Sequence, residues 1–299
     1  MAIALVTTDA EFMAGDPDVD MPSLISALSR VGVEATAVPW ADPATDWHAY
    51  DLVVLRSPWD YTQRFDEFAG WLERTAGQTR LLNCPELVRW NWDKRYLAQL
   101  HERGVPVVDT RFVSHGDDPD SVIGAMSSPR IVVKPAVSAG AQDTGLFDHD
   151  DPGATALAGR IVAGGRVALV QPELPAVTTA GETAVMYLGG GYSHSARKGP
   201  ILEPGGGLRG GTYIEIIEAT EPTDGEFAVA EATMAAVAGI HAELSCGCGA
   251  NLPLYARIDI AEAADGPVVL EAELVEPNLF LRVDPSAPDR FAAAISRVL

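Results

Sequence analysis

Two alternating runs near the C-terminus constrain the fold of this chain most: Tyr-Ala-Arg-Ile-Asp-Ile at 255–260 and Val-Val-Leu-Glu-Ala-Glu-Leu at 268–274. A segment containing Asp265-Gly266-Pro267 joins them, and two such runs around a turn predict an antiparallel hairpin. If the turn centres on Asp265, Asp259 lies opposite Glu271 and Arg257 lies opposite Glu273. Because side chains alternate along a strand, these four share one face. The other face is expected to hold the apolar residues Ile258, Ile260, Leu270, Ala272 and Leu274.

Three carboxylates would lie together on the polar face of this hairpin: Asp259, Glu271 and Glu273. Opposed Cβ atoms are about 4.5–5.5 Å apart, and like charges at that distance destabilise a sheet. The cluster therefore predicts a bound cation. Oxygen ligands without His or Cys indicate Mg²⁺ or Mn²⁺, and carboxylates that share substrate phosphates suit Mg²⁺ best. A solvated acidic face with an ion pair between Arg257 and Glu273 is the competing interpretation.

Lysine is rare in this chain, since Lys94, Lys134 and Lys198 stand against eighteen arginines. A compact ammonium suits a phosphate treated as a point charge, whereas arginine presents a planar fork. Lys94 is expected at a helix start, Lys134 at the end of an apolar strand before Pro135, and Lys198 on a later strand. We predict that the three meet at one phosphate-binding cleft. Chance usage in an arginine-preferring chain is the alternative.

Charge and composition exclude several classes of protein. A formal net charge of -21 and a pI near 4.5, with no run of Lys or Arg, argue against nucleic-acid binding. No stretch approaches about 18 apolar residues and the first residues lack a basic region, so we expect no membrane span, no signal peptide and a cytoplasmic protein. The odd cysteines, Cys84, Cys246 and Cys248, have no CxxC spacing. They favour reduced thiols over a disulfide or zinc framework.

The order of predicted elements divides the chain in two. Residues 1–85 have a βαβ pattern, with strands over 2–7, 33–38 and 51–56 and helices over 21–31 and 66–76, and are predicted to form a Rossmann-like α/β domain. Residues 86–299 are predicted to be α+β with antiparallel sheets. Strands are expected there over 130–134, 166–171, 181–188, 192–198, 212–218, 254–260 and 268–274. Helices are expected over 93–103, 119–126, 153–163 and 225–244.

Two other motifs carry less weight. Gly205-Gly206-Gly207-Leu208-Arg209-Gly210 formally matches GxGxxG, but it leads into a predicted strand. No helix N-terminus would then be available for a pyrophosphate. His194 lies on a predicted strand near Lys198, and we interpret it as a structural histidine.

Taken in order, these features resemble the ATP-grasp superfamily from about residue 84 to the C-terminus. The shared series is a lysine at a helix start, a lysine ending a strand, a linker strand, another lysine strand and a carboxylate hairpin. The resemblance implies two α+β lobes, about 112–175 and 176–299, that enclose ATP behind the pre-ATP-grasp βα domain. In that family ATP phosphorylates a carboxylate, and a nucleophile then displaces phosphate from the acyl phosphate.

The resemblance also implies how the nucleotide is held. Lys94 and Lys134 would contact it, under a glycine-rich cover at 138–145 that is poorly ordered without ATP. In the linker Pro172 lacks an N–H, so another residue must donate to adenine. Glu182 would accept the ribose hydroxyls, and Arg197 and Lys198 would face the β- and γ-phosphates. The remaining expected ATP contacts are Ser138, Gly140, Gln171, Glu173 and Leu174.

For catalysis, the resemblance places Mg²⁺ on Asp259, Glu271 and Glu273, although the family commonly has Asn at the last of these positions. Lys198 and Arg257 would be the catalytic cations, with Arg257 steadying the acyl phosphate. Substrate recognition is expected to draw on polar residues in otherwise apolar segments: Arg56, Tyr61, Glu276 and Asn278. Arg56 would fork a substrate carboxylate. A surface ion pair is the alternative for Arg56.

Within the superfamily, residues 180–202 and 270–277 resemble most the small group that contains D-cycloserine synthetase. That resemblance implies cyclisation of O-ureido-D-serine to D-cycloserine, with release of CO₂ and ammonia. An intermolecular amino-acid or peptide ligase is a second interpretation, and a non-catalytic nucleotide-binding module is a third. Expected partners are ATP and a small amino acid, with no nucleic acid or membrane, and a homo-oligomer is compatible with the sequence.

Overall fold

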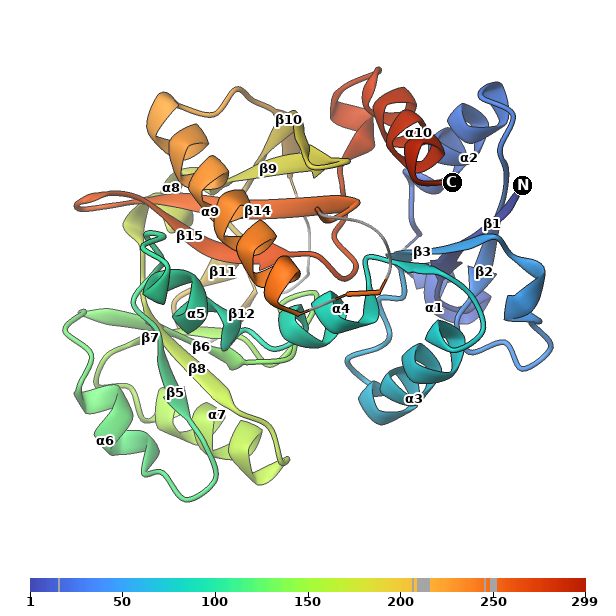
Figure 1. Cartoon of the computed structure of the whole chain (residues 1–299). Coiled ribbons are helices and arrows are strands. Elements are labelled where there is room, and N and C mark those ends of the chain that lie inside the picture. The colour runs from blue at the N-terminus through green and yellow to red at the C-terminus, as the bar shows by residue number, and fades with distance from the viewer. Residues whose placement is uncertain (16, 206, 209–215, 245, 248–251) are drawn as a thin grey trace.

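The computed structural model describes residues 1–299 except 16, 206, 209–215, 245 and 248–251. A parallel sheet near the N-terminus lies on one side of the molecule, and two antiparallel sheets lie on the other (Figure 1). This arrangement confirms the predicted combination of an α/β part and an α+β part. None of the described helices is long and apolar enough to cross a membrane.

The first domain is built on a parallel sheet in the order β2-β1-β3-β4. Residues 3–7 of β1 and all of β3 are buried, as expected for parallel strands covered on both faces. Its strands are β1 (Ala2–Thr7), β2 (Glu34–Pro39), β3 (Leu52–Ser57) and β4 (Leu81–Leu82). Its helices are α1 (Ala10–Gly15), α2 (Met21–Arg30) and α3 (Phe65–Ala76).

The small lobe is an antiparallel sheet in the order β5-β8-β6-β7 with two helices on one face. Burial alternates along β6, so Ile131 and Val133 enter the core while Val132 and Lys134 face the opposite side. The strands are β5 (Arg111–Val113), β6 (Arg130–Pro135), β7 (Gly145–Asp148) and β8 (Ala168–Pro172). The helices are α6 (Pro119–Gly124) and α7 (Pro152–Ala163).

The large lobe is an antiparallel sheet in the order β13-β10-β9-β14-β15, packed against α9 (Asp224–Glu243). A capping box between Thr223 and Glu226 fixes the start of α9. The strands are β9 (Glu182–Leu188), β10 (Gly191–Lys198), β13 (Ile217–Ala219), β14 (Tyr255–Ala263) and β15 (Gly266–Glu273). Smaller elements are α4 (Pro85–Asn91), α5 (Tyr96–Glu102), α8 (Pro175–Ala180), β11 (Leu202–Glu203) and β12 (Gly207–Leu208).

The hairpin of β14 and β15 pairs Arg257 with Glu273 and Asp259 with Glu271, as predicted. The position of the turn differs from the prediction. Ala263 pairs with Gly266, so the turn centres before Asp265, and a one-residue bulge beyond Asp259 restores the register. The bulge turns Leu270 out of the expected apolar face, and this side chain lines a cavity instead.

A C-terminal helix, α10 (Ala287–Val298), was not predicted. It packs on α2 of the first domain, with Phe291 and Ile295 fully buried (Figure 1). One hydrophobic core therefore contains residues from β1, β3 and α10 together. The first domain is consequently tied to the large lobe by packing as well as by the chain.

Two other sequence predictions need correction, and two lie partly outside the described residues. The helix expected over 93–103 is shorter than predicted, since α5 runs from Tyr96 to Glu102, and α4 before it was not predicted. The cysteines expected as free thiols are not all free, because Cys84 forms a disulfide with Cys246. Spacing arguments missed this pair because the two residues are 162 apart in sequence and meet only through the fold. Cys248, part of the motif at 205–210 and most of the strand expected over 212–218 lie outside the described residues.

Candidate active site

A cavity of about 430 Å³ lies where the two antiparallel sheets meet the first domain. All three lysines of the chain line it, so the predicted convergence is confirmed. Lys94 comes from the turn between α4 and α5, Lys134 from the outer face of β6, and Lys198 from the end of β10. Three separate elements therefore supply the cationic wall.

Each ammonium group is paired with acceptors in this structure. Lys134 Nζ donates to the Glu271 carboxylate at 2.5 Å, and Lys198 Nζ donates to Asp259 at 2.8 Å and also pairs with Glu182. Lys94 Nζ donates to the Ser138 carbonyl at 3.0 Å. Burial lowers the pKa of Lys198, but the charges of Asp259 and Glu182 outweigh this and hold it well above its usual value. Lys198 therefore keeps its charge, and each of the three lysines already has an oxygen acceptor at the position that a phosphate oxygen could take.

The carboxylates of Asp259, Glu271 and Glu273 meet beside these lysines, with an oxygen from each within 4.8 Å of the others. Only oxygen ligands are present, which fits Mg²⁺ or Mn²⁺. Asp259 is the deepest and does not line the cavity, because Arg257 and Lys198 cover it. Burial raises the pKa of Asp259, yet those two cations outweigh it and keep the pKa below its usual value.

Arg257 connects the carboxylates to the next segment of chain. Its guanidinium donates to both oxygens of Asp259 at 2.9 Å, to Glu273 at 2.5 Å and to the Asn278 carbonyl at 3.0 Å. Burial raises the pKa of Glu273 to about 7, with Arg257 opposing the rise and Asp259 adding to it. Glu273 is thus the carboxylate of the cluster whose charge changes near neutral pH.

The opposite end of the cavity is formed by the strand that links the two lobes. Gln171, Pro172, Glu173 and Leu174 line it, together with apolar side chains of the small lobe and of the 201–202 segment. Glu173 already accepts from Arg130 and Thr178. This end combines apolar side chains with Gln171 and Glu173 and holds none of the three lysines, in contrast to the charged end.

Residues from the first domain close the third side. Phe12, Trp59 and Tyr61 line the cavity next to Glu276 and Asn278. Trp59 Nε1 donates to the Glu276 carbonyl at 2.9 Å. Burial and then the charge of Glu273 raise the pKa of Glu276 to about 8, although a hydrogen bond from Tyr61 opposes the rise. This side of the cavity is aromatic, with a neutral carboxylic acid at pH 7.

Comparison with known proteins extends over the whole chain. A family model described as the N-terminal domain of D-cycloserine synthetase DcsG matches residues 3–83. The cycloserine biosynthesis protein DcsG of Streptomyces lavendulae is 36% identical over 308 residues, covering 100% of this chain and 99% of that protein. The chain belongs to the D-cycloserine synthetase family. A crystal structure of D-cycloserine synthetase DcsG matches it with a TM-score of 0.90 at 34% identity over 100% of both chains.

The fold of this family member is the predicted ATP-grasp fold. A D-alanine–D-alanine ligase from Bacillus anthracis, solved in complex with ATP, matches with a TM-score of 0.64 at 12% identity, covering 100% of this chain and 97% of the other. At that identity the match shows the fold alone. Family membership and fold together make the chain an ATP-grasp ligase.

Two residues expected in the site of this family member lie elsewhere. Arg197 precedes Lys198 on β10, and it does not line the cavity because successive side chains point to opposite faces of a strand. Arg56 is 1% exposed and also does not line the cavity. Its guanidinium donates to the Pro277 carbonyl at 2.6 Å and lies 3.5 Å from Asp18. Arg56 therefore positions the 276–278 segment through the Pro277 carbonyl and does not reach the cavity.

Several lining residues were not predicted. Trp59 follows the carboxyl end of β3, where ligands of parallel sheets usually bind, so its position was a usable signal. Asn91 lies at the end of α4, a helix that was not predicted, and Tyr96 lies inside the helix expected over 93–103. Asn91 bonds both the Ala272 carbonyl and the Leu274 amide at 2.7 Å, and thereby fixes α4 to β15.

Proposed function

We propose that this chain uses ATP and Mg²⁺ to close O-ureido-D-serine into D-cycloserine. The observation that carries the proposal is full-length similarity to DcsG, combined with a cavity that joins three lysines to three carboxylates. In this proposal residues 1–85 are the pre-ATP-grasp domain, and the lobes of residues 86–299 hold ATP between them. The protein would work in the cytoplasm.

ATP would lie along the cavity with its base at the linker strand. Pro172 has no N–H, and the Glu173 N–H already donates to the Arg130 carbonyl at 2.9 Å. The Leu174 N–H is the next backbone donor, so we assign it to the adenine edge, with Gln171 and Glu173 beside the base. Glu182 would leave Lys198 to accept the ribose hydroxyls. Ser138 and Gly140 would cover the phosphates.

The phosphates would enter between the cations and the carboxylates. Lys134 and Lys198 would exchange their carboxylate partners for phosphate oxygens, and Lys94 would turn from the Ser138 carbonyl to a phosphate. This exchange would free Glu271 and Asp259 of their lysine partners. Together with Glu273, they would then bind the metal. Bound Mg²⁺ would offset charge on the phosphates as the γ-phosphoryl group transfers.

The reaction would proceed in three steps. A substrate carboxylate oxygen attacks the γ-phosphorus, the bond to ADP breaks, and an acyl phosphate forms. The ureido nitrogen on the substrate oxygen then attacks the acyl carbon, phosphate leaves, and the ring closes. Water cleaves the carbamoyl group to CO₂ and ammonia. Arg257 lies beside this position and would stabilise the oxyanion that forms at the acyl carbon.

The third side of the cavity would recognise the amino acid. Tyr61 and Asn278 would bind its polar groups, and Glu276, which keeps its proton at pH 7, would act as a hydrogen-bond donor. Trp59 would limit the length of the substrate. Arg56 would act only by positioning, because it holds the Pro277 carbonyl.

The test is a product analysis with the purified protein, ATP and Mg²⁺. O-ureido-D-serine alone should give D-cycloserine, ADP, phosphate and ammonia in equal amounts. The matched control is the L-enantiomer, which should give little phosphate. Phosphate release only when a second amino acid is added, with a dipeptide as the product, would replace the cyclisation with intermolecular ligation.

A further inference from the structure

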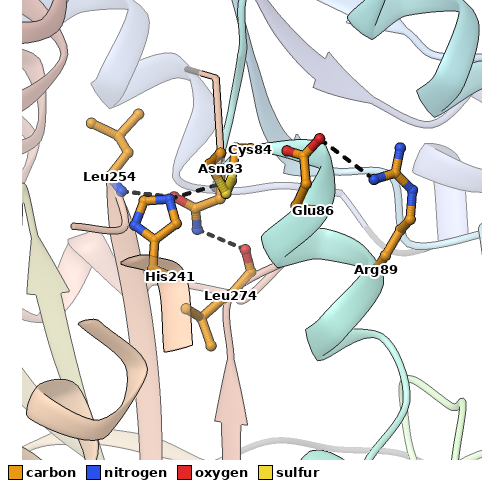
Figure 2. The surroundings of a disulfide bond; sticks show 8 residues. Asn83, Cys84, Glu86, Arg89, His241, Leu254 and Leu274 are labelled. Carbon is orange, nitrogen blue, oxygen red and sulfur yellow. Dashed lines mark hydrogen bonds and ion pairs between the residues drawn. A yellow bond between two sulfur atoms is a disulfide. The ribbon is translucent and has the colours of Figure 1, made fainter. Parts of the chain in front are cut away.

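A second cluster of metal-ligand side chains lies outside the cavity, where the chain enters α4. Cys84, His241 and Cys246 each offer an atom within 4.8 Å of the others, and none of the three lines the cavity. In this structure the two cysteines form a disulfide, and His241 Nε2 lies 3.3 Å from the Cys84 sulfur. Figure 2 shows the His241 ring facing Cys84 beneath the start of α4.

Two of the three side chains lie beside well-bonded elements. Asn83, next to Cys84, bonds the Leu254 amide and the Leu274 carbonyl, each at 2.7 Å (Figure 2). It also bonds the Tyr255 carbonyl at 2.9 Å. His241 belongs to the last turn of α9 and is 3% exposed. Cys84 is 1% exposed, while Cys246 is half-buried. The fold therefore positions Cys84 and His241, and Cys246 is the member of the cluster that is partly open to solvent.

We propose that, when the disulfide is reduced, Cys84, His241 and Cys246 bind a zinc ion. A dithiol reductant would supply two electrons and two protons, giving two cysteine thiols and the oxidised cyclic disulfide of the reductant. Zinc would then displace both thiol protons. Two thiolates and a neutral imidazole around Zn²⁺ carry no net charge, which makes the complex compatible with burial.

The geometry of the cluster suits this ligand set. Zn–S bonds of about 2.3 Å and Zn–N bonds of about 2.0–2.1 Å keep tetrahedral ligands roughly 3.5 Å apart. The 3.3 Å between Cys84 Sγ and His241 Nε2 is close to that separation. Reduction frees the two sulfurs to separate, and water completes the coordination on the half-exposed side. Zinc would thus hold the end of α9 to residue 84, as the disulfide does.

The chain contains a second candidate cation site, and ligand chemistry separates the two. The carboxylates of Asp259, Glu271 and Glu273 are hard oxygen ligands that suit Mg²⁺, whereas thiolates select softer ions. Only the cysteine cluster can give sulfur-to-metal charge-transfer absorption. The test below needs no ATP and no turnover, so its result does not depend on the proposed reaction.

The test uses Co²⁺ as a visible substitute for zinc, in the reduced full-length chain. Cys248→Ser serves as the background, so that sulfur bands arise only from Cys84 and Cys246. One Co²⁺ per chain should give a charge-transfer band and the visible bands of tetrahedral cobalt, and Zn²⁺ should abolish them. The oxidised protein should give neither, and Glu271→Gln should leave both bands unchanged.

Variants then assign the ligands. Cys84→Ser and His241→Gln should each weaken cobalt binding by at least about 10-fold, whereas His101→Gln, on the exposed side of α5, should not. Circular dichroism checks that each variant is folded. If a variant unfolds, zinc protection of Cys84 and Cys246 against alkylation is measured in the parent chain instead. Absence of the bands after reduction, bands that survive loss of both cysteines, or a disulfide that dithiol reduces only in the unfolded chain would overturn the zinc site.

Discussion

Lys134 donates from the small lobe to Glu271 of the large lobe across 2.5 Å, so one ion pair spans the two walls of the cavity. In the proposed cycle this pair must separate, because the ammonium moves to a phosphate and the carboxylate to Mg²⁺. Without ATP, the pair neutralises two charges that are mostly shielded from water. Its two partners thus have one function before nucleotide binds and another afterwards.

Glu271→Gln tests this change of partner. Loss of one anionic ligand should lower phosphate release by at least about 100-fold, since metal stabilisation of the transferring group contributes several kcal/mol. The measurement is phosphate release at saturating ATP and a series of Mg²⁺ concentrations. Glu203→Gln, at an exposed position of β11, is the control and should be near normal. Unchanged turnover in Glu271→Gln at ordinary Mg²⁺ would contradict the metal assignment.

Glu276 should make stability fall as pH rises. Burial and the charge of Glu273 raise its pKa to about 8, while an unfolded glutamate ionises near pH 4.3. Between about pH 4.3 and 8 the folded chain therefore keeps a proton that the unfolded chain loses, so stability decreases with pH. Thermal unfolding across this range should show a flatter decline in Glu276→Gln. Equal slopes in Glu276→Gln and the parent chain would refute this, and Glu67→Gln, at an exposed position, is the control.

Arg56→Ala should destabilise the fold. It should not remove a direct substrate contact, because Arg56 does not line the cavity. It removes a buried guanidinium that lies 3.5 Å from Asp18 and leaves that carboxylate uncompensated. Breaking such a buried pair costs about 3–5 kcal/mol. Chemical unfolding measures the loss, and Arg30→Ala, which breaks an exposed pair with Asp289, should cost only about 0–1 kcal/mol. A parent-like stability in Arg56→Ala would show that the buried contacts contribute little.

Asn83→Ala should loosen the junction between the first domain and the large sheet. The substitution removes three buried hydrogen bonds, and each buried group left unsatisfied costs about 1–3 kcal/mol. Hydrogen exchange should accelerate at the Leu254 amide, which donates to Asn83. The Leu274 amide donates to Asn91 and is the internal control. If the Leu254 amide exchanged at the same rate in the variant as in the parent chain, this role of Asn83 would be contradicted.

A non-hydrolysable ATP analogue should protect residues 138–145 from proteolysis. The loop contains Ala141 and Asp143 at positive φ, a conformation that side-chain-bearing residues rarely adopt. Lys94 holds its first residue, Ser138, through the carbonyl. Limited proteolysis with and without the analogue should differ several-fold at this loop and not at the exposed 115–118 turn. Equal cleavage in both conditions would remove the loop from the nucleotide cover.

The sequence predicted the carboxylate hairpin and the meeting of the lysines because both follow from strand periodicity and residue chemistry. The hairpin register was correct for a partly wrong reason. Ala263 opposes Gly266, and a bulge that no periodicity shows shifts the pairing back to Asp259 with Glu271. The same bulge explains why Leu270 lines the cavity instead of the apolar face on which it was predicted. The alternation of side chains along the strand was enough to exclude Arg197 from the cavity, because Lys198 next to it was expected to face the cavity.

Other features depend on contacts between distant residues, which a single sequence does not show. Cys84 meets Cys246 only because α9 ends beside the start of α4. Arg56 was expected at the cavity because it is a polar residue in an otherwise apolar segment. The carbonyl of Pro277 and the carboxylate of Asp18 instead surround it, and both come from segments without predicted structure. Such partners become visible only in three dimensions.

The shared core of the first domain, α10 and the large sheet has a consequence for the order of binding. These parts pack together and supply Trp59, Tyr61, Arg257 and Glu276 to the cavity. The small lobe has a core of its own and supplies Lys134 and Gln171. In the proposed cycle, a movement of the small lobe would change the nucleotide end of the cavity and leave the amino-acid end in place, so the amino acid would not need ATP in order to bind.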